Sequence, residues 1–93
     1  MTSKERAYLK SLANKVPALY QIGKEGIGEN MVAAINDALE ARELIKVHVL
    51  ENALAEAKDL AAELAEKTNA QVVQVIGRKA IIYRRSKKNI CGM

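Results

Sequence analysis

The sequence has very few of the residues on which enzyme chemistry and metal binding depend. It contains one histidine, His48, and one cysteine, Cys91, among 93 residues. It has no histidine or cysteine cluster at metal-ligand spacing, no nucleophile elbow and no P-loop. The carboxylates fall where we expect the solvent faces of helices. The sequence therefore predicts a protein that is not an enzyme and that needs no metal and no cofactor.

Disulfides, membrane spans and leader segments are also missing from the sequence. A single cysteine cannot form an internal disulfide, so we interpret Cys91 as a free thiol without a function, in a reducing compartment. No apolar run approaches the roughly 20 residues of a membrane span. Residues 1–10 lack the apolar segment of a signal peptide. We therefore expect a cytoplasmic protein without membrane contact.

What the sequence does contain is a regular alternation of helical and extended patterns. We expect one domain over residues 1–93, with a core over about residues 3–86 and a frayed tail over residues 87–93. The apolar spacing predicts helices that begin at a Ser3 cap, near Glu29 and at an Asn52 cap, and that end near Ala13, Arg42 and Thr68.

Extended runs separate and follow these helices. They predict strands over residues 16–22, 44–50, 71–76 and 80–83, with a tight hairpin at Gly77 and Arg78. Pro17 restricts the first of these strands to an edge of the sheet or to a strand start. The order α-β-α-β-α-β-β favours an α/β fold, a single compact domain with a four-stranded mixed sheet and packed helices.

Charge is distributed unevenly along the chain. Residues 1–24 carry a formal charge of +4, residues 25–67 one of −6 and residues 68–93 one of +6. If the fold brings the two ends of the chain together, they form a basic surface with an acidic region elsewhere. That arrangement is typical of a protein that binds a polyanion.

The segment QIGKEGI places two glycines around a lysine where a strand ends and a helix begins. Gly23 and Gly26 allow a ligand to approach the main chain, Lys24 adds a positive charge, and the helix start supplies free N–H groups. This combination suits a phosphate. The same spacing also occurs in ordinary strand-to-helix turns, so the motif alone leaves both interpretations open.

Further basic residues follow the predicted strands. Lys46 and His48 share the outward face of one strand, where they either contact RNA or simply face solvent. Arg78, Lys79, Arg84 and Arg85 flank the last strand, and we expect them to contact a polyanion. Tryptophan and phenylalanine are absent and tyrosine occurs three times. Contacts to RNA backbone and shape therefore fit better than base stacking.

These segments resemble the CRM domain, the chloroplast RNA splicing and ribosome maturation domain, in its single-domain bacterial YhbY-like form. The matching segments are SKERAYLKSLA, IGKEGI, AINDALEARELIKVHV and QVVQVIGRKAIIYRR, which span roughly residues 3–86. The combination of G-K-x-G, the E-L-I-K-V strand and the I-G-x-x-x-x-x-Y-R ending is specific, although no single motif is.

The resemblance implies a fold similar to the C-terminal domain of translation initiation factor three. It implies that Gly23, Lys24, Glu25 and Gly26 form a loop analogous to the G-x-x-G loop of KH domains, which clamps nucleic-acid backbone. It also implies association with large-subunit ribosomal RNA in pre-ribosomal particles. Two departures are the acidic Glu25 inside the loop, and Gly28 where the family often has a capping serine or threonine.

The leading hypothesis is thus a monomeric RNA-binding protein that assists assembly of the large ribosomal subunit. The acidic middle of the chain leaves a second hypothesis open. In that hypothesis the protein is an interaction module whose acidic helices dock a basic ribosomal protein, with no direct contact to RNA.

Overall fold

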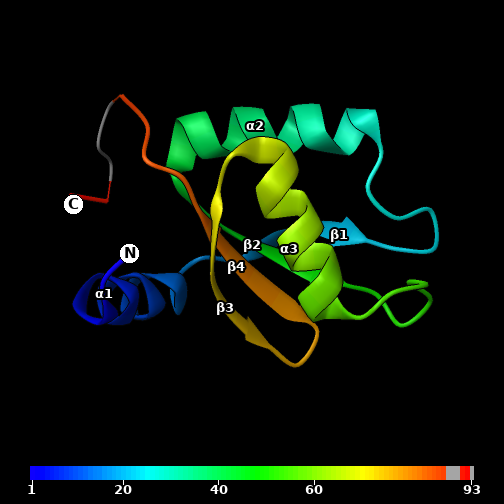
Figure 1. Cartoon of the computed structure of the whole chain (residues 1–93), viewed down its shortest axis with the longest axis horizontal. Coiled ribbons are helices and arrows are strands. Elements are labelled where there is room, and N and C mark those ends of the chain that lie inside the picture. Colours follow the sequence, from blue (N-terminus) through cyan, green and yellow to red (C-terminus); the bar gives the residue numbers. More distant parts are fainter. Residues whose placement is uncertain (88–90, 93) are drawn as a thin grey trace.

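A computed structural model describes residues 1–87, 91 and 92 of the chain. Seven elements follow one another in the predicted order (Figure 1). Their bounds are α1 Ser3–Ala13, β1 Ala18–Ile22, α2 Glu29–Arg42, β2 Leu44–Val49, α3 Ala57–Thr68, β3 Gln71–Ile76 and β4 Lys79–Tyr83. Two of these match the sequence prediction at both ends: α2 and β3.

The four strands form one mixed sheet in the order β1-β2-β4-β3. β1 lies parallel to β2, whereas β4 runs antiparallel to both β2 and β3. β1 is therefore an edge strand, as Pro17 immediately before it requires. The predicted α/β class, with a four-stranded mixed sheet and packed helices, is confirmed.

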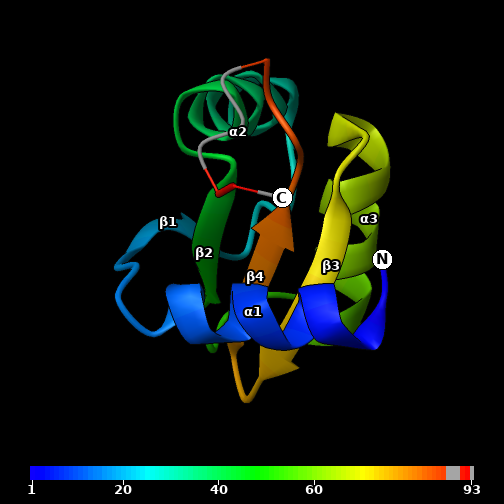
Figure 2. The ribbon, with the colours of Figure 1, turned by 90° about the vertical axis from the view of Figure 1, so that its left-hand side faces the viewer.

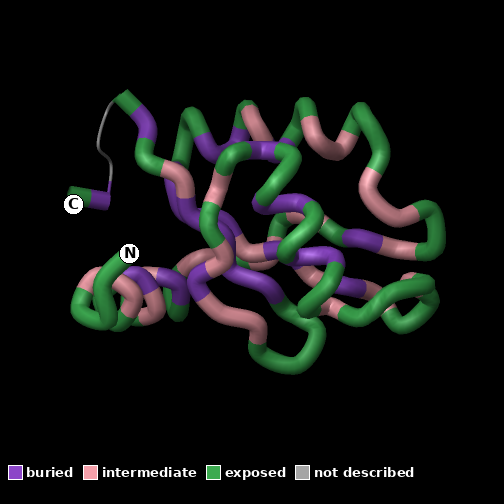
Figure 3. The backbone as a smooth tube through the Cα atoms, viewed as in Figure 1, coloured by how far each residue is buried: buried purple, intermediate pink, exposed green. Residues whose placement is uncertain are grey.

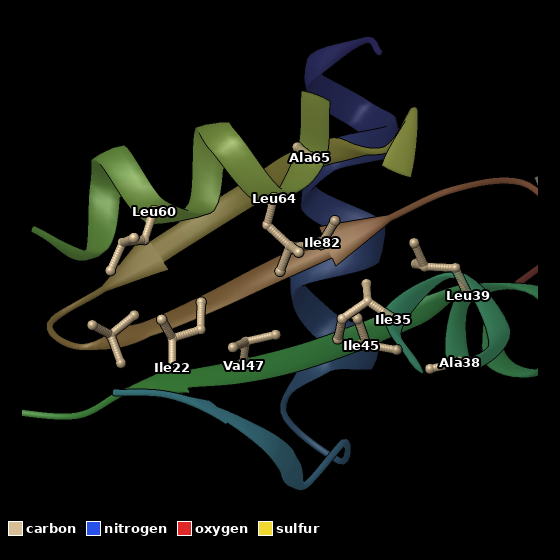
Figure 4. Close-up of a cluster of buried hydrophobic side chains, with 11 residues drawn as sticks. Ile22, Ile35, Ala38, Leu39, Ile45, Val47, Leu60, Leu64, Ala65 and Ile82 are labelled. Atoms are coloured by element: carbon tan, nitrogen blue, oxygen red, sulfur yellow. The ribbon is translucent and has the colours of Figure 1, made fainter. Parts of the chain in front are cut away.

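The main core lies between one face of the sheet and the helices α2 and α3. Alternation along β2 directs Ile45, Val47 and Val49 to this face, and all three are buried. Leu39 from α2 and Leu64 from α3 point toward them (Figure 4). Buried stretches accordingly follow the strands and the facing sides of both helices (Figure 3).

The opposite face of the sheet is partly covered by α1, which crosses the strands (Figure 2) and packs against Leu44 at the start of β2. Leu9 and Ala13 of this helix pack in a second, smaller core with Leu44, Val73, Ile81 and Tyr83 of the sheet. The guanidinium of Arg6 attaches the helix to the edge strand β3, because it donates to the carbonyl oxygens of Val72 and Val73 at 3.0 and 2.6 Å. In the described part of the chain, no helix lies over the rest of this face.

Two predicted helix starts are wrong. Thr2, not Ser3, caps α1: its hydroxyl accepts from the Glu5 N–H, and the Glu5 carboxylate accepts from the Thr2 N–H. These two reciprocal hydrogen bonds form a capping box. The sequence analysis missed it because it begins one residue earlier than expected, so that Glu5 and not Arg6 is the third residue of the helix. The third helix begins at Ala57 instead of Asn52, since residues 50–56 form turns and bends after β2.

The residues after β4 are held by a buried carboxylate. Glu43 is fully buried, and its carboxylate accepts hydrogen bonds from the Ser86 N–H, the Ser86 hydroxyl and the Cys91 N–H at 2.7, 2.6 and 2.9 Å. The Tyr8 hydroxyl donates to the Cys91 carbonyl at 2.7 Å. The predicted frayed tail is thus wrong for Cys91, while residues 88–90 and 93 lie outside the described part.

Burial also changes the chemistry of the cysteine thiol. Burial, together with the neighbouring Glu43 carboxylate, raises the pKa of Cys91 to about 11. A thiol with so high a pKa is almost entirely protonated at neutral pH and is a poor nucleophile. The absence of a function predicted for Cys91 stays a prediction, but the residue is part of the packed structure.

Candidate nucleic-acid interface

Residues 23–26 form a tight turn between the end of β1 and the start of α2 (Figure 1). The Gly26 N–H donates to the Gly23 carbonyl at 3.0 Å, and Gly26 has a φ of 70° that disfavours a side chain. Lys24 and Glu25 are exposed at the tip of this turn. A Cβ atom added at Gly23 would lie 3.4 Å from the Asn52 amide oxygen, so Gly23 sits close to the loop after β2.

The start of α2 beside this turn has an open N-cap. Gly28 is the N-cap residue, as predicted, and it provides no side-chain hydrogen bond to the first turn of the helix. A shallow depression of about 480 Å³ lies here, lined by Glu25, Gly26, Gly28, Glu29, Asn30 and Met31. The free N–H groups attract an anion, but the carboxylates of Glu25 and Glu29 at the rim oppose it.

The β3–β4 hairpin lies at the same end of the sheet as this turn (Figure 1). Gly77 takes a φ of 58° at the hairpin, and Arg78 is exposed. The Val49 N–H donates to the Arg78 carbonyl at 2.6 Å, and the Leu50 N–H donates to the Ile22 carbonyl at 2.8 Å. The end of β2 therefore joins the hairpin to the Gly23–Gly26 turn.

Lys46, His48 and Lys79 lie on the sheet face that α2 and α3 do not cover. His48 pairs with Lys79 across β2 and β4, and Lys46 precedes His48 by two residues on the same face. Three neutral side chains from the edge strands share the uncovered part of this face. We call it the open sheet face, and it consists of Gln21, Lys46, His48, Gln74, Ile76 and Lys79.

Sequence reasoning missed the three neutral members of the open sheet face. Their alternation with buried neighbours was visible, but the register that aligns them with the three basic members was not. That register depends on irregularities in both edge strands, between Ala18 and Tyr20 in β1 and between Val72 and Gln74 in β3. No pattern in the sequence indicates these bulges.

The last two predicted basic residues lie at the other end of the sheet. The Arg84 guanidinium donates to the Asn36 side chain, to the carbonyl oxygens of Asn36 and Thr68, and to Glu40, at 2.7 to 3.1 Å. These contacts tie the residue after β4 to both helices of the main core. Arg85 is exposed and lines a small depression with Glu5. The structure does not bring either arginine to the Gly23–Gly26 turn.

The tyrosines offer no ring to the open sheet face. Tyr83 is buried under α1, and Tyr20 packs against the main core. Tyr8 lies on α1, where its hydroxyl bonds to Cys91. Within the described positions of the open sheet face, the functional groups are therefore two ammonium groups, an imidazole, two amides and one apolar side chain.

The described residues form neither a metal site nor a membrane span. A metal site needs at least three ligands close together. Residues 1–87, 91 and 92 contain no group of three histidine, cysteine, aspartate or glutamate side chains that could hold a metal ion. Within the same part of the chain, no helix combines the length and apolar character needed to cross a membrane.

Comparison with known proteins places this geometry in a family. The model of the CRS1/YhbY (CRM) domain matches residues 1–84. The probable RNA-binding protein YqeI of Bacillus subtilis is 42% identical over 89 residues, covering 96% of this chain and 93% of its own. An RNA-binding protein of Haemophilus influenzae is 35% identical over 89 residues, covering 95% and 89%.

A solved structure agrees with the fold. The solution structure of a hypothetical protein from Staphylococcus aureus, described as a candidate RNA-binding protein, superposes with a TM-score of 0.80. It is 53% identical in sequence and covers 96% of this chain and 93% of its own. These relatives are named as RNA-binding proteins and not as enzymes, in line with the sequence prediction. The chain belongs to the CRS1/YhbY (CRM) domain family.

Proposed function

We propose that the protein binds RNA by its backbone at the end of the sheet formed by the Gly23–Gly26 turn and the β3–β4 hairpin. The observation that carries this proposal is that exposed Lys24 and Arg78 lie at the same end of the sheet, on segments that flank the end of β2 and are bonded to it through Ile22 and Arg78. The names of the relatives support RNA as the polyanion.

The turn suits a phosphate group for steric and electrostatic reasons. No atom lies within 4 Å of a Cβ added at Gly26, so backbone of RNA can approach the main chain there. Lys24 and Arg78 supply positive charge from two sides. Glu25 lowers the affinity unless its exposed side chain turns away from the bound strand. Arg84 is left out of the proposed interface because its guanidinium is occupied within the fold.

We extend the proposal to the biological partner that the family resemblance implies. The protein acts in the cytoplasm as a monomer on large-subunit ribosomal RNA in pre-ribosomal particles, and it assists their assembly. Ultraviolet crosslinking in cells, followed by sequencing of the recovered RNA, tests this. Reads concentrated in large-subunit ribosomal RNA support the assembly role, whereas reads scattered over messenger RNAs contradict it and leave RNA binding intact.

The first prediction concerns the turn itself. Replacing Lys24 with glutamate reverses a charge beside the bound phosphate, and replacing Gly26 with aspartate adds both a charge and a side chain at positive φ. We expect each variant to bind an RNA hairpin at least about tenfold more weakly, since each charge-assisted contact is worth about 1.5–3 kcal/mol. Filter binding or fluorescence anisotropy measures the loss.

Lys58→Glu is the matched control for Lys24→Glu, because Lys58 is also exposed but lies on α3. It should bind RNA nearly as the unmodified protein does. Circular dichroism establishes that each variant is folded. If all turn variants bind with unchanged affinity, the Gly23–Gly26 turn has only a structural role.

The second hypothesis keeps one observation in its favour. Leu54 is 87% exposed and stands beside Glu51 and Glu56 in an open depression of about 780 Å³. An apolar side chain beside carboxylates suits a basic protein segment, and Arg78 lines the opposite part of the same depression. In this alternative the partner remains bound after nuclease treatment, and loss of every partner on nuclease digestion excludes it as the main activity.

A further inference from the structure

We propose that the open sheet face is a second RNA-binding surface, and that it holds the backbone of a base-paired segment of the RNA bound at the Gly23–Gly26 turn. This inference rests on the proposed RNA-binding function and names the class of RNA that the site takes. It is carried by the strand register, the charges on this face and the absence of aromatic rings there.

The register places the charged groups of the open sheet face in one compact cluster. Gln21, His48, Lys79 and Ile76 form a single row across all four strands, because each is paired with the next. Directly opposed side chains start about 5 Å apart. Lys46 lies about 7 Å from His48 along the same strand, at two residues of about 3.3 Å each.

Within the described part of the chain, no carboxylate pairs with the cations of the open sheet face. Its six members include no acidic residue, and the ion pairs within the described ranges are Lys67–Glu63 and Arg84–Glu40, both on the helical side of the sheet. Lys46 and Lys79 are diagonal neighbours across β2 and β4, because Lys79 pairs with His48, so their two ammonium groups repel each other weakly. An external anion relieves that repulsion, which makes the open sheet face a suitable surface for a chain of phosphates.

The chemistry of this face selects against an unpaired strand. Proteins that bind single strands stack bases on aromatic rings, and the open sheet face has none. Four strands spaced about 4.8 Å apart give instead a surface roughly 14 Å wide. Ammonium groups and the Gln21 and Gln74 amides on such a surface can contact phosphates and 2′-hydroxyls across the wide, shallow minor groove of an A-form helix.

The open sheet face is continuous with the proposed site at the turn. Lys79 belongs to the face, and the adjacent Arg78 belongs to the hairpin that the end of β2 joins to the Gly23–Gly26 turn. One RNA can therefore contact both surfaces around the end of the sheet. On its other side the face is limited by α1, whose Leu9 packs in the second core with Tyr83.

The test compares an RNA hairpin with an unpaired RNA of the same length and base composition, at several salt concentrations. The variant Lys46→Gln with Lys79→Gln removes two positive charges from the face. Lys58→Gln with Lys67→Gln removes the same charge from α3 and serves as the matched control. We expect the face variant to bind the hairpin roughly tenfold more weakly and to lower the salt slope by about 2, at about 1 per lost phosphate contact.

Three other results would each contradict a different claim: the role of the open sheet face, its preference for base-paired RNA, or RNA binding itself. Unchanged affinity of the face variant, together with a loss in Lys24→Glu, overturns the inference and leaves the proposed function intact. An equal loss for the unpaired RNA overturns its assignment to base-paired RNA. Failure of the unmodified protein to bind either RNA refutes the proposed function itself. The variant Lys46→Arg with Lys79→Arg should retain binding, which separates loss of charge from a disturbed sheet.

Discussion

At the scale of single residues, Glu43 determines how the C-terminal segment is attached. It adopts a φ of 64°, which is uncommon for a residue with a side chain, and it ends α2 immediately before β2. Its main-chain carbonyl also accepts from the Arg84 N–H at 3.0 Å. One residue thus connects α2, the end of β4 and the residues that follow it.

Glu43→Gln is expected to destabilise the protein by about 2 kcal/mol. Hydrogen bonds to a buried charged acceptor contribute about 1.5–3 kcal/mol, and the amide of glutamine would direct a donor at groups that already donate. Urea unfolding followed by circular dichroism measures the change. Asp37→Asn, at an exposed position of the same helix, is the control and should remain within about 0.5 kcal/mol of the unmodified protein. Equal stability of the two variants would contradict this role of Glu43.

At the scale of secondary-structure elements, the local sequence patterns predict which helices and strands exist and in what order. They predict the residues at which these elements begin and end less well. α2 was predicted at both ends because its apolar spacing and the Gly28 cap agree. The start of α3 was missed because helix-forming residues continue backward to Asn52, while the chain makes turns there and brings Asn52 beside Gly23. That contact joins residues far apart in sequence, so no local pattern reveals it.

The candidate site shows the same division between local and non-local information. The Gly23–Gly26 turn could be placed from the sequence because its glycines and lysine are adjacent in the chain. The different positions of Lys79 and Arg84 could not be predicted, although both flank β4. Only the tertiary structure shows that Lys79 lies on the open sheet face, while Arg84 turns to Asn36 and Thr68 on the helical side.

The cap of α1 gives a prediction at this scale. The hydrogen bond from the Thr2 N–H lowers the pKa of the Glu5 carboxyl in the folded protein. A lowered folded pKa means that this stabilisation is present above the ordinary value of 4.5 and disappears as the pH falls below it. Thr2→Ala removes the hydroxyl that accepts from the Glu5 N–H, and it should reduce stability by about 1 kcal/mol at pH 7, a typical value for a lost cap.

Thr2→Ala keeps the main-chain N–H that binds the Glu5 carboxylate, so Glu5→Gln is the variant that tests the titration. The difference in stability between Glu5→Gln and the unmodified protein should shrink as the pH is lowered through the Glu5 titration. Thermal unfolding at neutral and acidic pH measures both values. Thr2→Ser keeps the hydroxyl acceptor and is the matched control, with nearly unchanged stability. A difference that does not depend on pH would show that Glu5 does not take part in the cap.

At the scale of the whole molecule, the two sides of the sheet differ in chemistry. The side covered by α2 and α3 carries both ion pairs found within the described ranges, together with acidic positions such as Asp59 and Glu66. The other side carries α1 and the open sheet face. An RNA bound at the open sheet face would leave the acidic helices directed away from it.

The order of strands in the sheet also constrains when the protein can fold during synthesis. β4 is the last of the seven elements, yet it lies in the interior of the sheet between β2 and β3. Until Lys79–Tyr83 has left the ribosome, β3 has no partner and β2 pairs only with the edge strand β1. Two-stranded pairs are marginally stable in water.

A nascent chain that ends at Ile76 should therefore remain unfolded, despite containing all three helices. Hydrogen exchange should show little protection in that fragment, whereas protection should appear in all strands together once residues 77–87 are added. Protected β1 and β2 amides in the shorter fragment would contradict this expectation. Folding is thus postponed until β4 is available, so the packing of the three helices and both faces of the sheet should form together.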